Sequence, residues 1–356
     1  MRAAVLREVG QPLSIETVDL ADPGPHEVLV TMLASGVCHS DYSLMHGTLP
    51  SPVPAILGHE GAGVVTAVGP DTTLVKPGDH VVLAWQAPCD TCPQCLAGQH
   101  ELCSTPATAG FAGRATIDSE PVSMMMALGT FAEATVTHEK CLVPYPERYP
   151  AEIAALVGCA VMTGVGAVVN TAGLRPGETV AVIGCGGVGL SVIQGARLAG
   201  ASRIIAIDRV PEKLQVARAN GATDAIADED AGEQVLELTG GVGVDHAFDC
   251  VGISSTMRAA WDVVRRGGHC ILVGIGPIDQ PLPFVLGDLM SSKTLKFSLY
   301  GGANARRDFP RLLALNELGR LDLNALISER IGLDGINDAM ERLTDGRAAR
   351  SVIVYK

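Results

Sequence analysis

The sequence predicts an α/β protein of two domains, one rich in β-strands and one built on a doubly wound parallel sheet. The chain has 356 residues, about twice the usual domain length of ~100–200 residues. Its first part consists of short strand-like runs separated by turns, and the part up to about residue 298 alternates between strands and helices. These three observations predict two architectures in one chain, and no internal repeat or low-complexity linker is present.

The first predicted domain begins with five short β-rich runs. They cover residues 2–9, 13–20, 27–34, 61–69 and 81–85, and the turn sequences GQP, DPGP and VKPGDH lie between them. Short strands at close spacing with such turns are typical of a β-barrel or sandwich.

The second predicted domain alternates strands and helices. We expect strands at 179–184, 203–208, 246–252 and 269–276, and helices at 188–198, 213–221 and 257–266. This βαβ alternation predicts a parallel sheet with helices on both faces. The chain then returns to mixed character and ends on a strand-like run at 349–356. We therefore assign 1–160 and 300–356 to the first domain and 161–299 to the second.

Composition and charge exclude several functions. The formal net charge of -13 argues against nucleic acid and anionic membranes as partners, because little would neutralise phosphate. The first ten residues do not resemble a signal peptide, and no stretch approaches ~18 uninterrupted apolar residues. We expect a soluble cytoplasmic protein, in which the spacing of the ten cysteines indicates metal binding rather than disulfides.

A glycine-rich motif predicts a dinucleotide site. Gly184, Gly186 and Gly189 form G-x-G-x-x-G directly after a predicted strand and at the start of a helix, where backbone can approach a pyrophosphate closely. The next strand ends at Asp208, whose carboxylate can bind the adenosine ribose and repel a 2′-phosphate. This favours NAD, although the adjacent Arg209 leaves dual use with NADP open.

Four cysteines predict a closed structural zinc site. They are spaced C-x2-C-x2-C-x7-C, which provides four thiolates within one short loop: Cys89, Cys92, Cys95 and Cys103. The alternatives are reduced core cysteines, a zinc knuckle on nucleic acid, or an iron–sulfur cluster. The polar, proline-bearing loop disfavours the first, and Asp90 and Glu101 without a basic cluster disfavour the second.

Motifs along the whole chain resemble the medium-chain zinc-dependent alcohol dehydrogenases that carry two zinc ions. In order they are GVCHSD, GHEGAGVV, KPGDHV, the four-cysteine loop, GCAVMTGVGAV and IGCGGVGLS. The resemblance implies a GroES-like β-barrel catalytic domain and a Rossmann domain, with the active site between them. It also implies NAD as coenzyme, two Zn²⁺ per chain, a small alcohol or aldehyde substrate, and a homodimer, with a tetramer as the alternative.

The resemblance also implies roles for individual residues. Cys38, His59 and Cys159 match the catalytic zinc ligands, and Glu60 matches a carboxylate that can transiently approach the metal. Asp41 matches a carboxylate that orients the histidine, and Ser40 matches the hydroxyl that opens the proton relay. The matching coenzyme contacts are His39, Thr163, Gly184, Gly186, Gly187, Val188, Gly189, Asp208, Arg209, Lys213, Val273, Ile275, Ser298, Tyr300 and Arg350. Leu49, Trp85 and Leu128 match the substrate pocket.

Two departures from the family pattern bear on function. Ser43 stands where many relatives end the proton relay on a histidine, so water or another group such as His46 would end it here. Relatives that oxidise the glutathione adduct of formaldehyde hold it with an acidic residue and an arginine. The matching positions here are Leu49 and Ala107, although Arg114 lies near in sequence and leaves this activity as an alternative.

We therefore predict an NAD-linked oxidoreductase acting on medium-chain or aromatic primary alcohols. The thiol-adduct formaldehyde dehydrogenase is the main alternative, and a secondary-alcohol or polyol dehydrogenase is less favoured. A non-metal enone reductase would not need the cysteine–histidine–cysteine set, and a non-enzymatic binding protein would not need Ser40 beside it.

Overall fold

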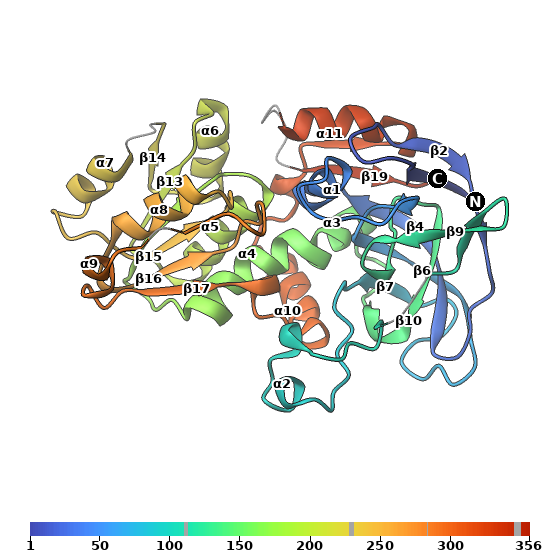
Figure 1. Ribbon diagram of the computed structural model, residues 1–356. Helices are drawn as coiled ribbons and strands as arrows, with labels where there is room; N and C mark the ends of the chain where they lie inside the picture. Colours follow the sequence, from blue (N-terminus) through green and yellow to red (C-terminus); the bar gives the residue numbers. More distant parts are fainter. Residues whose placement is uncertain (110–112, 228–230, 283, 345–349) are drawn as a thin grey trace. The chain divides into compact units, whose positions relative to one another are not determined.

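The computed structural model describes residues 1–109, 113–227, 231–282, 284–344 and 350–356 (Figure 1). It divides into two compact units. Unit 1 comprises Met1–Cys159, Asn304–Ala314 and Ile327–Lys356, and unit 2 comprises Ala160–Ala303 and Leu315–Leu326. The last of these segments differs from the sequence-based assignment of all of 300–356 to the first domain. Hydrogen bonds join this segment to the rest of unit 2: the Gln194 amide bonds the backbone N–H and C=O of Asp322, each at 2.8 Å, and Arg197 Nη2 donates to the Arg320 carbonyl at 3.5 Å.

Unit 1 consists mainly of β-strands in two sheets. One has the order β2-β1-β5-β9-β8-β3, and the other has the order β11-β7-β6-β4-β19-β18, with β10 also paired to β4. The strands are β1 Arg2–Leu6, β2 Ser14–Thr17, β3 Asp19–Leu20, β4 Glu27–Gly36, β5 Ala55–Ile56, β6 Glu60–Val68, β7 His80–Leu83, β8 Ala115–Ile117, β9 Glu120–Met124, β10 Ala134–His138, β11 Leu142–Pro144, β18 Glu329–Ile331 and β19 Ser351–Val354. The predicted strand at 349–356 corresponds to β19, and residue 349 lies outside the described residues.

The core of unit 1 follows from alternation along its strands. In β4, Val28, Val30 and Met32 are buried, whereas Thr31 between them is exposed, as the period-2 geometry of a strand requires. The helices of this unit are α1 His39–Met45, α2 Pro93–Leu96, α3 Ala151–Leu156, α10 Ala305–Glu317 (which runs into unit 2) and α11 Ile336–Thr344, with 3-10 turns η1 His100–Leu102, η2 Met125–Ala127, η3 Glu139–Cys141 and η8 Leu333–Gly335.

Unit 2 contains a parallel sheet of the order β14-β13-β12-β15-β16-β17 (Figure 1). Its strands are β12 Thr179–Ile183, β13 Arg203–Ile207, β14 Asp224–Ile226, β15 Val244–Asp249, β16 Val264–Leu272 and β17 Thr294–Phe297. Its helices are α4 Met162–Gly166, α5 Gly187–Ala199, α6 Pro211–Asn220, α7 Ala231–Leu238, α8 Ser254–Val263 and α9 Leu286–Leu289, with 3-10 turns η6 Leu299–Gly301 and η7 Asn324–Leu326. All five strand pairs are parallel, as the sequence predicts. The predicted helix at 257–266 ends earlier, at Val263, because Val264 pairs with Val244 at the start of β16.

A continuous helical stretch, Ala151–Ala172, contains α3, the π-helical turn η4 Val157–Val161, α4 and the π-helical turn η5 Ala167–Ala172. Within the described residues it is the one helix whose length and composition would suffice to cross a membrane. From the sequence no spanning segment is expected there, because glycine and polar residues interrupt the apolar runs. Because 78% of its most apolar window is buried inside the protein, it has the character of a core helix.

Glu139 ties two loops of unit 1 together. One carboxylate oxygen accepts from the backbone N–H groups of Thr73 and Leu74, both at 2.7 Å, and the other lies 2.9 Å from His26 Nδ1. Burial raises the pKa of this carboxyl, but the two backbone donors and His26 outweigh burial, and the net pKa is lowered. The carboxylate therefore stabilises the folded state in its charged form.

We expect Glu139→Gln to reduce the free energy of unfolding at pH 7 by about 1–3 kcal/mol. A neutral amide replaces the charged carboxylate that accepts these hydrogen bonds, and bonds to a charged acceptor are stronger. The folded-state pKa is lowered, so this stabilisation is present above the unfolded carboxyl pKa of ~4.3 and is lost as pH falls through the folded value. Urea midpoints of wild type and variant should therefore converge on acidification. A constant gap down to low pH would contradict this assignment.

Candidate active site and metal centres

Strand register in unit 1 brings distant parts of the chain to one place. Gly36 at the end of β4 pairs with Glu60 at the start of β6, so Cys38 and His59 lie just beyond paired strand ends. Gly36 also pairs with Val352 of β19, which brings Arg350 to the same end. Cys159 lies in the π-helical turn η4, an irregularity that is frequent at functional sites.

Four potential ligand side chains converge there. One ligand atom from each of Cys38, His59, Glu60 and Cys159 lies within 4.8 Å of the others, and all four residues are buried. Close backbone approach makes this possible: a Cβ at Gly158 would lie 2.7 Å from the Leu83 carbonyl oxygen. The structure therefore brings together Cys38, His59 and Cys159, which spacing in the sequence alone could not group.

Asp41 organises the two sides of this cluster. One carboxylate oxygen accepts from the Cys38 backbone N–H at 2.8 Å, and the other accepts from Gly58 N at 3.1 Å and lies 3.0 Å from His59 Nδ1. The contact at Nδ1 leaves Nε2 of the imidazole as the ligand atom, an arrangement common behind metal-ligating histidines. Because Asp41 is fully buried, these bonds fix the His59 ring.

Glu60 and Arg350 form an ion pair against the cluster. Arg350 Nη2 lies 3.2 Å from Glu60 Oε1, and Arg350 Nη1 donates to the Val37 carbonyl at 2.8 Å. Among the described residues, neither Glu60 oxygen has a partner with hydrogen-bond geometry, although both are buried. A Cβ at Gly36 would lie 2.2 Å from Glu60 Oε2, so glycine leaves room for this carboxylate.

The electrostatics of this cluster favour a bound cation. The hydrogen bond between the thiols lowers the pKa of Cys38 well below its usual value and raises that of Cys159. Burial raises the pKa of Glu60 to about 7 against the opposing charge of Arg350. Burial lowers the pKa of His59, but Asp41 and Cys38 outweigh it, so the net pKa is raised. Two buried sulfurs, an imidazole and an unsatisfied carboxylate fit the donor set of a catalytic zinc site.

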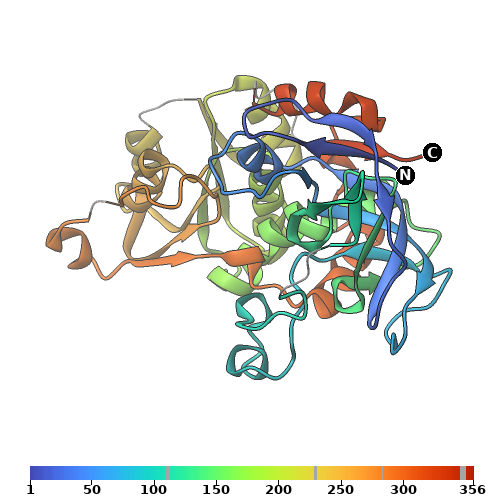
Figure 2. The same ribbon diagram turned by 45° about the vertical axis from the view of Figure 1, so that its right-hand side comes forward.

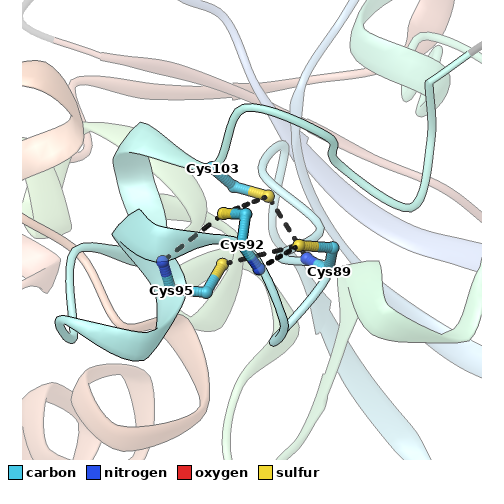
Figure 3. A group of neighbouring side chains, drawn as sticks. All are labelled: Cys89, Cys92, Cys95 and Cys103. Carbon is cyan, nitrogen blue, oxygen red and sulfur yellow. Dashed lines mark hydrogen bonds between the residues drawn. The ribbon is translucent and has the colours of Figure 1, made fainter.

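The four cysteines of the second cluster also converge (Figure 3). Their ligand atoms lie within 4.8 Å of one another, with Sγ–Sγ distances of 4.0 Å between Cys89 and Cys95 and 3.9 Å between Cys92 and Cys103. Zn–S bonds of ~2.3 Å in a tetrahedron require sulfurs about 3.8 Å apart. The geometry therefore fits a closed tetrathiolate zinc site.

Hydrogen bonds lower the pKa of two of these thiols and so favour their thiolate forms. Bonds from Thr105 and Thr91 lower the pKa of Cys89 to about 5, and the backbone N–H of Cys95 lowers that of Cys92 to about 7. Burial raises the pKa of Cys95 to about 12, so a bound cation would be needed to ionise all four thiols. Thr91 and Thr105 were not singled out from the sequence, where only their position beside Cys89 and Cys103 could have indicated them.

The residues of the proposed proton relay lie on and around α1. Ser40 Oγ is 3.8 Å from Cys38 Sγ, and Ser40 is half-buried beside the cluster. Ser43 is buried on the same helix. His46 is exposed, with its ring 4.2 Å from that of Tyr42, and His39 is also exposed, with its ring 5.5 Å from Tyr42.

The glycine-rich turn of unit 2 leaves room for a ligand to approach its backbone closely. Gly184 has φ +90°, and a Cβ at Gly189 would lie 1.8 Å from the Gly184 carbonyl oxygen, whereas a Cβ at Gly186 would meet nothing within 4 Å. The space over Gly186 is where a phosphate could contact backbone, at the start of α5, whose first residues are Gly187 and Val188. Asp208 follows β13 and accepts from Cys185 N at 2.8 Å, so the predicted carboxylate lies against this turn.

The remaining predicted coenzyme residues differ in exposure. Thr163, Val273, Ser298 and Tyr300 are buried in unit 2, Lys213 is half-buried, and Ile275 and Arg209 are exposed. Ser298 Oγ bonds Thr171 Oγ1 at 2.8 Å, and Tyr300 has φ 53°. Arg350 is only 3% exposed and forms an ion pair with Glu60, so it lies at the metal cluster of unit 1. This contact is not predicted from the sequence.

The three predicted substrate-pocket residues differ in burial. Leu128 has no exposed area and packs in a core cluster of unit 1 with Val28, Met32 and Leu83. Its place in the substrate pocket therefore stays a prediction, as it does for the other two pocket residues. Leu49 and Trp85 are half-buried.

Comparison with known proteins agrees with this geometry. An alcohol dehydrogenase GroES-like domain matches residues 24–147, and a zinc-binding dehydrogenase domain matches residues 187–317. The S-(hydroxymethyl)glutathione dehydrogenase of Escherichia coli O1:K1 / APEC is 38% identical over 366 aligned positions, which cover 99% of each chain.

Two solved structures share the whole fold. The alcohol dehydrogenase zinc-binding domain protein from Burkholderia ambifaria is 33% identical with a TM-score of 0.94, covering 100% of this chain and 98% of that one. Benzyl alcohol dehydrogenase from Acinetobacter calcoaceticus is 30% identical with a TM-score of 0.92, covering 100% and 99%. The predicted fold class is confirmed, and the chain belongs to the zinc-dependent medium-chain alcohol dehydrogenase family, a family of NAD(P)-linked oxidoreductases.

Proposed function

We propose that the protein oxidises medium-chain or aromatic primary alcohols to aldehydes, reversibly, with NAD. The observation that carries this proposal is the buried convergence of Cys38, His59 and Cys159, with Ser40 beside them. A closed metal site would not need a hydroxyl at that position, whereas an alcohol dehydrogenase needs one to handle the substrate proton.

The chemistry divides between the bound groups and the chain. Zinc held by Cys38, His59 and Cys159 would supply a Lewis acid for the alcohol oxygen, and NAD held by the glycine-rich turn would accept hydride. Ser40 accepts a hydrogen bond from the substrate hydroxyl and passes its proton outward. Asp41 keeps the His59 ring oriented throughout. Arg350 holds the Glu60 carboxylate at the ligand cluster.

NAD rather than NADP is the coenzyme that Asp208 favours. Its carboxylate lies against the glycine-rich turn through Cys185 N and also accepts from Val210 N at 2.9 Å. A carboxylate held at this position would repel a 2′-phosphate and accept hydrogen bonds from a ribose hydroxyl. Arg209, exposed beside it, is the residue that would moderate the preference.

Oxidation of the glutathione adduct of formaldehyde is the second candidate, because the E. coli relative carries that activity in its name. The environment of Arg114 instead supports oxidation of simple alcohols. This is the arginine that lies near Ala107 in sequence, where relatives hold the glutathione adduct with an arginine. Its Nε and Nη2 donate to the two carboxylate oxygens of Glu27 at 2.8 and 3.1 Å. The Glu27 carboxylate already balances the charge of this guanidinium, which weakens its attraction for a glutathione carboxylate, and Leu49 and Ala107 carry no charge.

A substrate panel separates the two candidates. The purified zinc-loaded protein is given benzyl alcohol, hexan-1-ol, ethanol, and formaldehyde with glutathione, each with NAD or NADP, and reduced coenzyme is followed at 340 nm. We expect the highest kcat/KM with benzyl alcohol or hexan-1-ol and NAD. A higher kcat/KM for formaldehyde with glutathione would replace the proposal by the second candidate.

We propose that the protein forms a homodimer through unit 2. Its sheet ends on β17, all of whose residues are exposed, and Figure 2 shows this strand in orange at the sheet edge. Large apolar side chains before it are also exposed: Ile278, Val285, Leu286, Leu289 and Met290. An unprotected strand edge beside an apolar surface is suited to a second copy across a two-fold axis. Light scattering should give twice the chain mass of 36.9 kDa, and a monomeric mass at micromolar concentration would contradict the proposal.

We also propose a cytoplasmic location. All ten cysteines are free, and the two clusters require reduced thiols to bind metal.

A further inference from the structure

The four-cysteine loop has an unbalanced negative charge. We define the cysteine loop as residues 86–107; it contains Asp90 and Glu101 but neither lysine nor arginine. Four thiolates around one Zn²⁺ add a further net charge of about −2. A cation from outside the loop would therefore both stabilise the bound metal and hold the loop in place.

Lys140, from the 3-10 turn η3, supplies such a cation. Its Nζ lies 3.1 Å from the Pro88 carbonyl oxygen, 3.1 Å from the Cys89 carbonyl oxygen and 2.7 Å from Asp90 Oδ2. An ammonium group has three N–H donors, so these three acceptors satisfy it completely. The Lys140 side chain is 23% exposed, which places the charge in a partly desolvated position.

The turn η3, which carries Lys140, is held in place by hydrogen bonds. The Lys140 backbone N–H donates to His138 Nδ1 at 3.1 Å, and the neighbouring Glu139 is held by the backbone of Thr73 and Leu74. Lys140 therefore joins a fixed part of the barrel to the backbone of a predicted metal ligand, Cys89.

Few other hydrogen bonds hold the segment around Cys89, the first cysteine of the loop. Ala107 N donates to the Ala87 carbonyl at 2.9 Å, which closes the base of the loop, and Gln86 Nε2 donates to the Glu101 carbonyl at 3.3 Å within it. The remaining contacts of Cys89 are to its own loop, such as its N–H to Cys103 Sγ at 3.3 Å. Arg307 of α10 also interacts electrostatically with the loop, at Glu101. Among the described contacts of the Cys89 segment, the charged one from outside the loop is that of Lys140.

We propose that Lys140 is the positioning residue of the structural metal site: it fixes the Cys89 segment and offsets the charge of the tetrathiolate, and so slows metal release from the loop. The proposal rests on the assignment of zinc to the four cysteines. It requires no direct contact between Lys140 and the metal.

Metal release from the loop tests the proposal. In a Cys159→Ala background, expected to retain only the loop zinc, release to excess 4-(2-pyridylazo)resorcinol is followed by the absorbance of the zinc–dye complex. We expect Lys140→Met to release zinc about tenfold faster than the parent, the effect of losing a charge-assisted tether. Lys140→Arg keeps the charge with a different donor geometry and should restore most of the difference. Lys76→Met, at an exposed lysine of the same unit, should release zinc at the parent rate.

Three outcomes would overturn the proposal, and they are distinguishable. A Cys159→Ala protein without zinc removes the metal assignment itself, and this is read from metal content before any rate is measured. Release from Lys140→Met at the parent rate removes the role of Lys140. Equal acceleration of both zinc ions in the otherwise wild-type protein means that Lys140→Met loosens the barrel as a whole, because a positioning role predicts faster release of the loop zinc alone.

Discussion

Cys159→Ala is expected to contain one zinc ion per chain instead of two and to lose alcohol turnover by at least ~10³-fold. Cys159 Sγ is one of the four ligand atoms that converge in unit 1. Its removal leaves one thiolate, one imidazole and the Glu60 carboxylate, which is paired with Arg350 and is therefore a weaker ligand than the lost thiolate. Metal content by atomic emission and turnover at 340 nm measure the two effects. The loop zinc should remain, since none of its four ligands is touched.

Cys141→Ala is the matched control. Cys141 is another fully buried cysteine of unit 1, but it packs in the barrel core and belongs to neither metal cluster. This variant should keep both zinc ions and its activity. Its free energy of unfolding should fall, because the lost sulfur leaves a cavity in the core. If Cys159→Ala itself retains two zinc ions, then Cys159 is not a ligand and the proposed catalytic set is wrong.

Ser40→Ala is expected to lower kcat by ~10²–10⁴-fold, the usual contribution of a positioned proton-transfer group. Ser40 Oγ lies 3.8 Å from Cys38 Sγ, so its hydroxyl is beside the predicted catalytic metal without being a predicted ligand. Zinc content and the dissociation constant for NAD should therefore stay unchanged. Steady-state kinetics, metal analysis and fluorescence titration with NAD separate these readouts.

Two serine variants control this experiment. Ser40→Thr keeps the hydroxyl and should retain activity toward slim primary alcohols, while the added methyl group should disfavour bulky ones. Ser43→Ala removes a buried hydroxyl of the same helix and should cost much less if water ends the relay. Near wild-type turnover by Ser40→Ala would mean that the proton leaves by another route, with His46 or bulk water as the groups to test.

Local features of the chain could be predicted from the sequence because their determinants are close in sequence. The cysteine loop needs only four ligands within 15 residues, and its sulfurs do converge in the structure. The glycine-rich turn likewise depends on one strand, three glycines and one helix start, and Gly184 and Gly189 show the backbone strain and close approach that require glycine. Regular alternation of strand and helix was sufficient to predict the parallel sheet of unit 2.

Other features depended on contacts that no local pattern contains. The short 3-10 turn η3 gave no periodic signal, yet its Glu139 and Lys140 tie two separate loops to the barrel. Leu128 carries the same apolar character whether it faces a substrate or the core, so only the structure could show that it is buried in a core cluster. The inclusion of residues 315–326 in unit 2 likewise depended on long-range contacts, such as those of Gln194 with Asp322 and of Arg197 with Arg320.

By itself, the sequence determined the two architectures, the cysteine loop and the nucleotide turn, since each is specified by residues within a short stretch. Resemblance to a family was needed to group Cys38, His59 and Cys159. Only the tertiary structure decided how they meet: β4 pairs Gly36 with Glu60 on one side and with Val352 on the other. That register brings the ligands to one end of the sheet and adds Arg350 to Glu60, because hydrogen bonds between strands, rather than positions along the chain, set which side chains become neighbours.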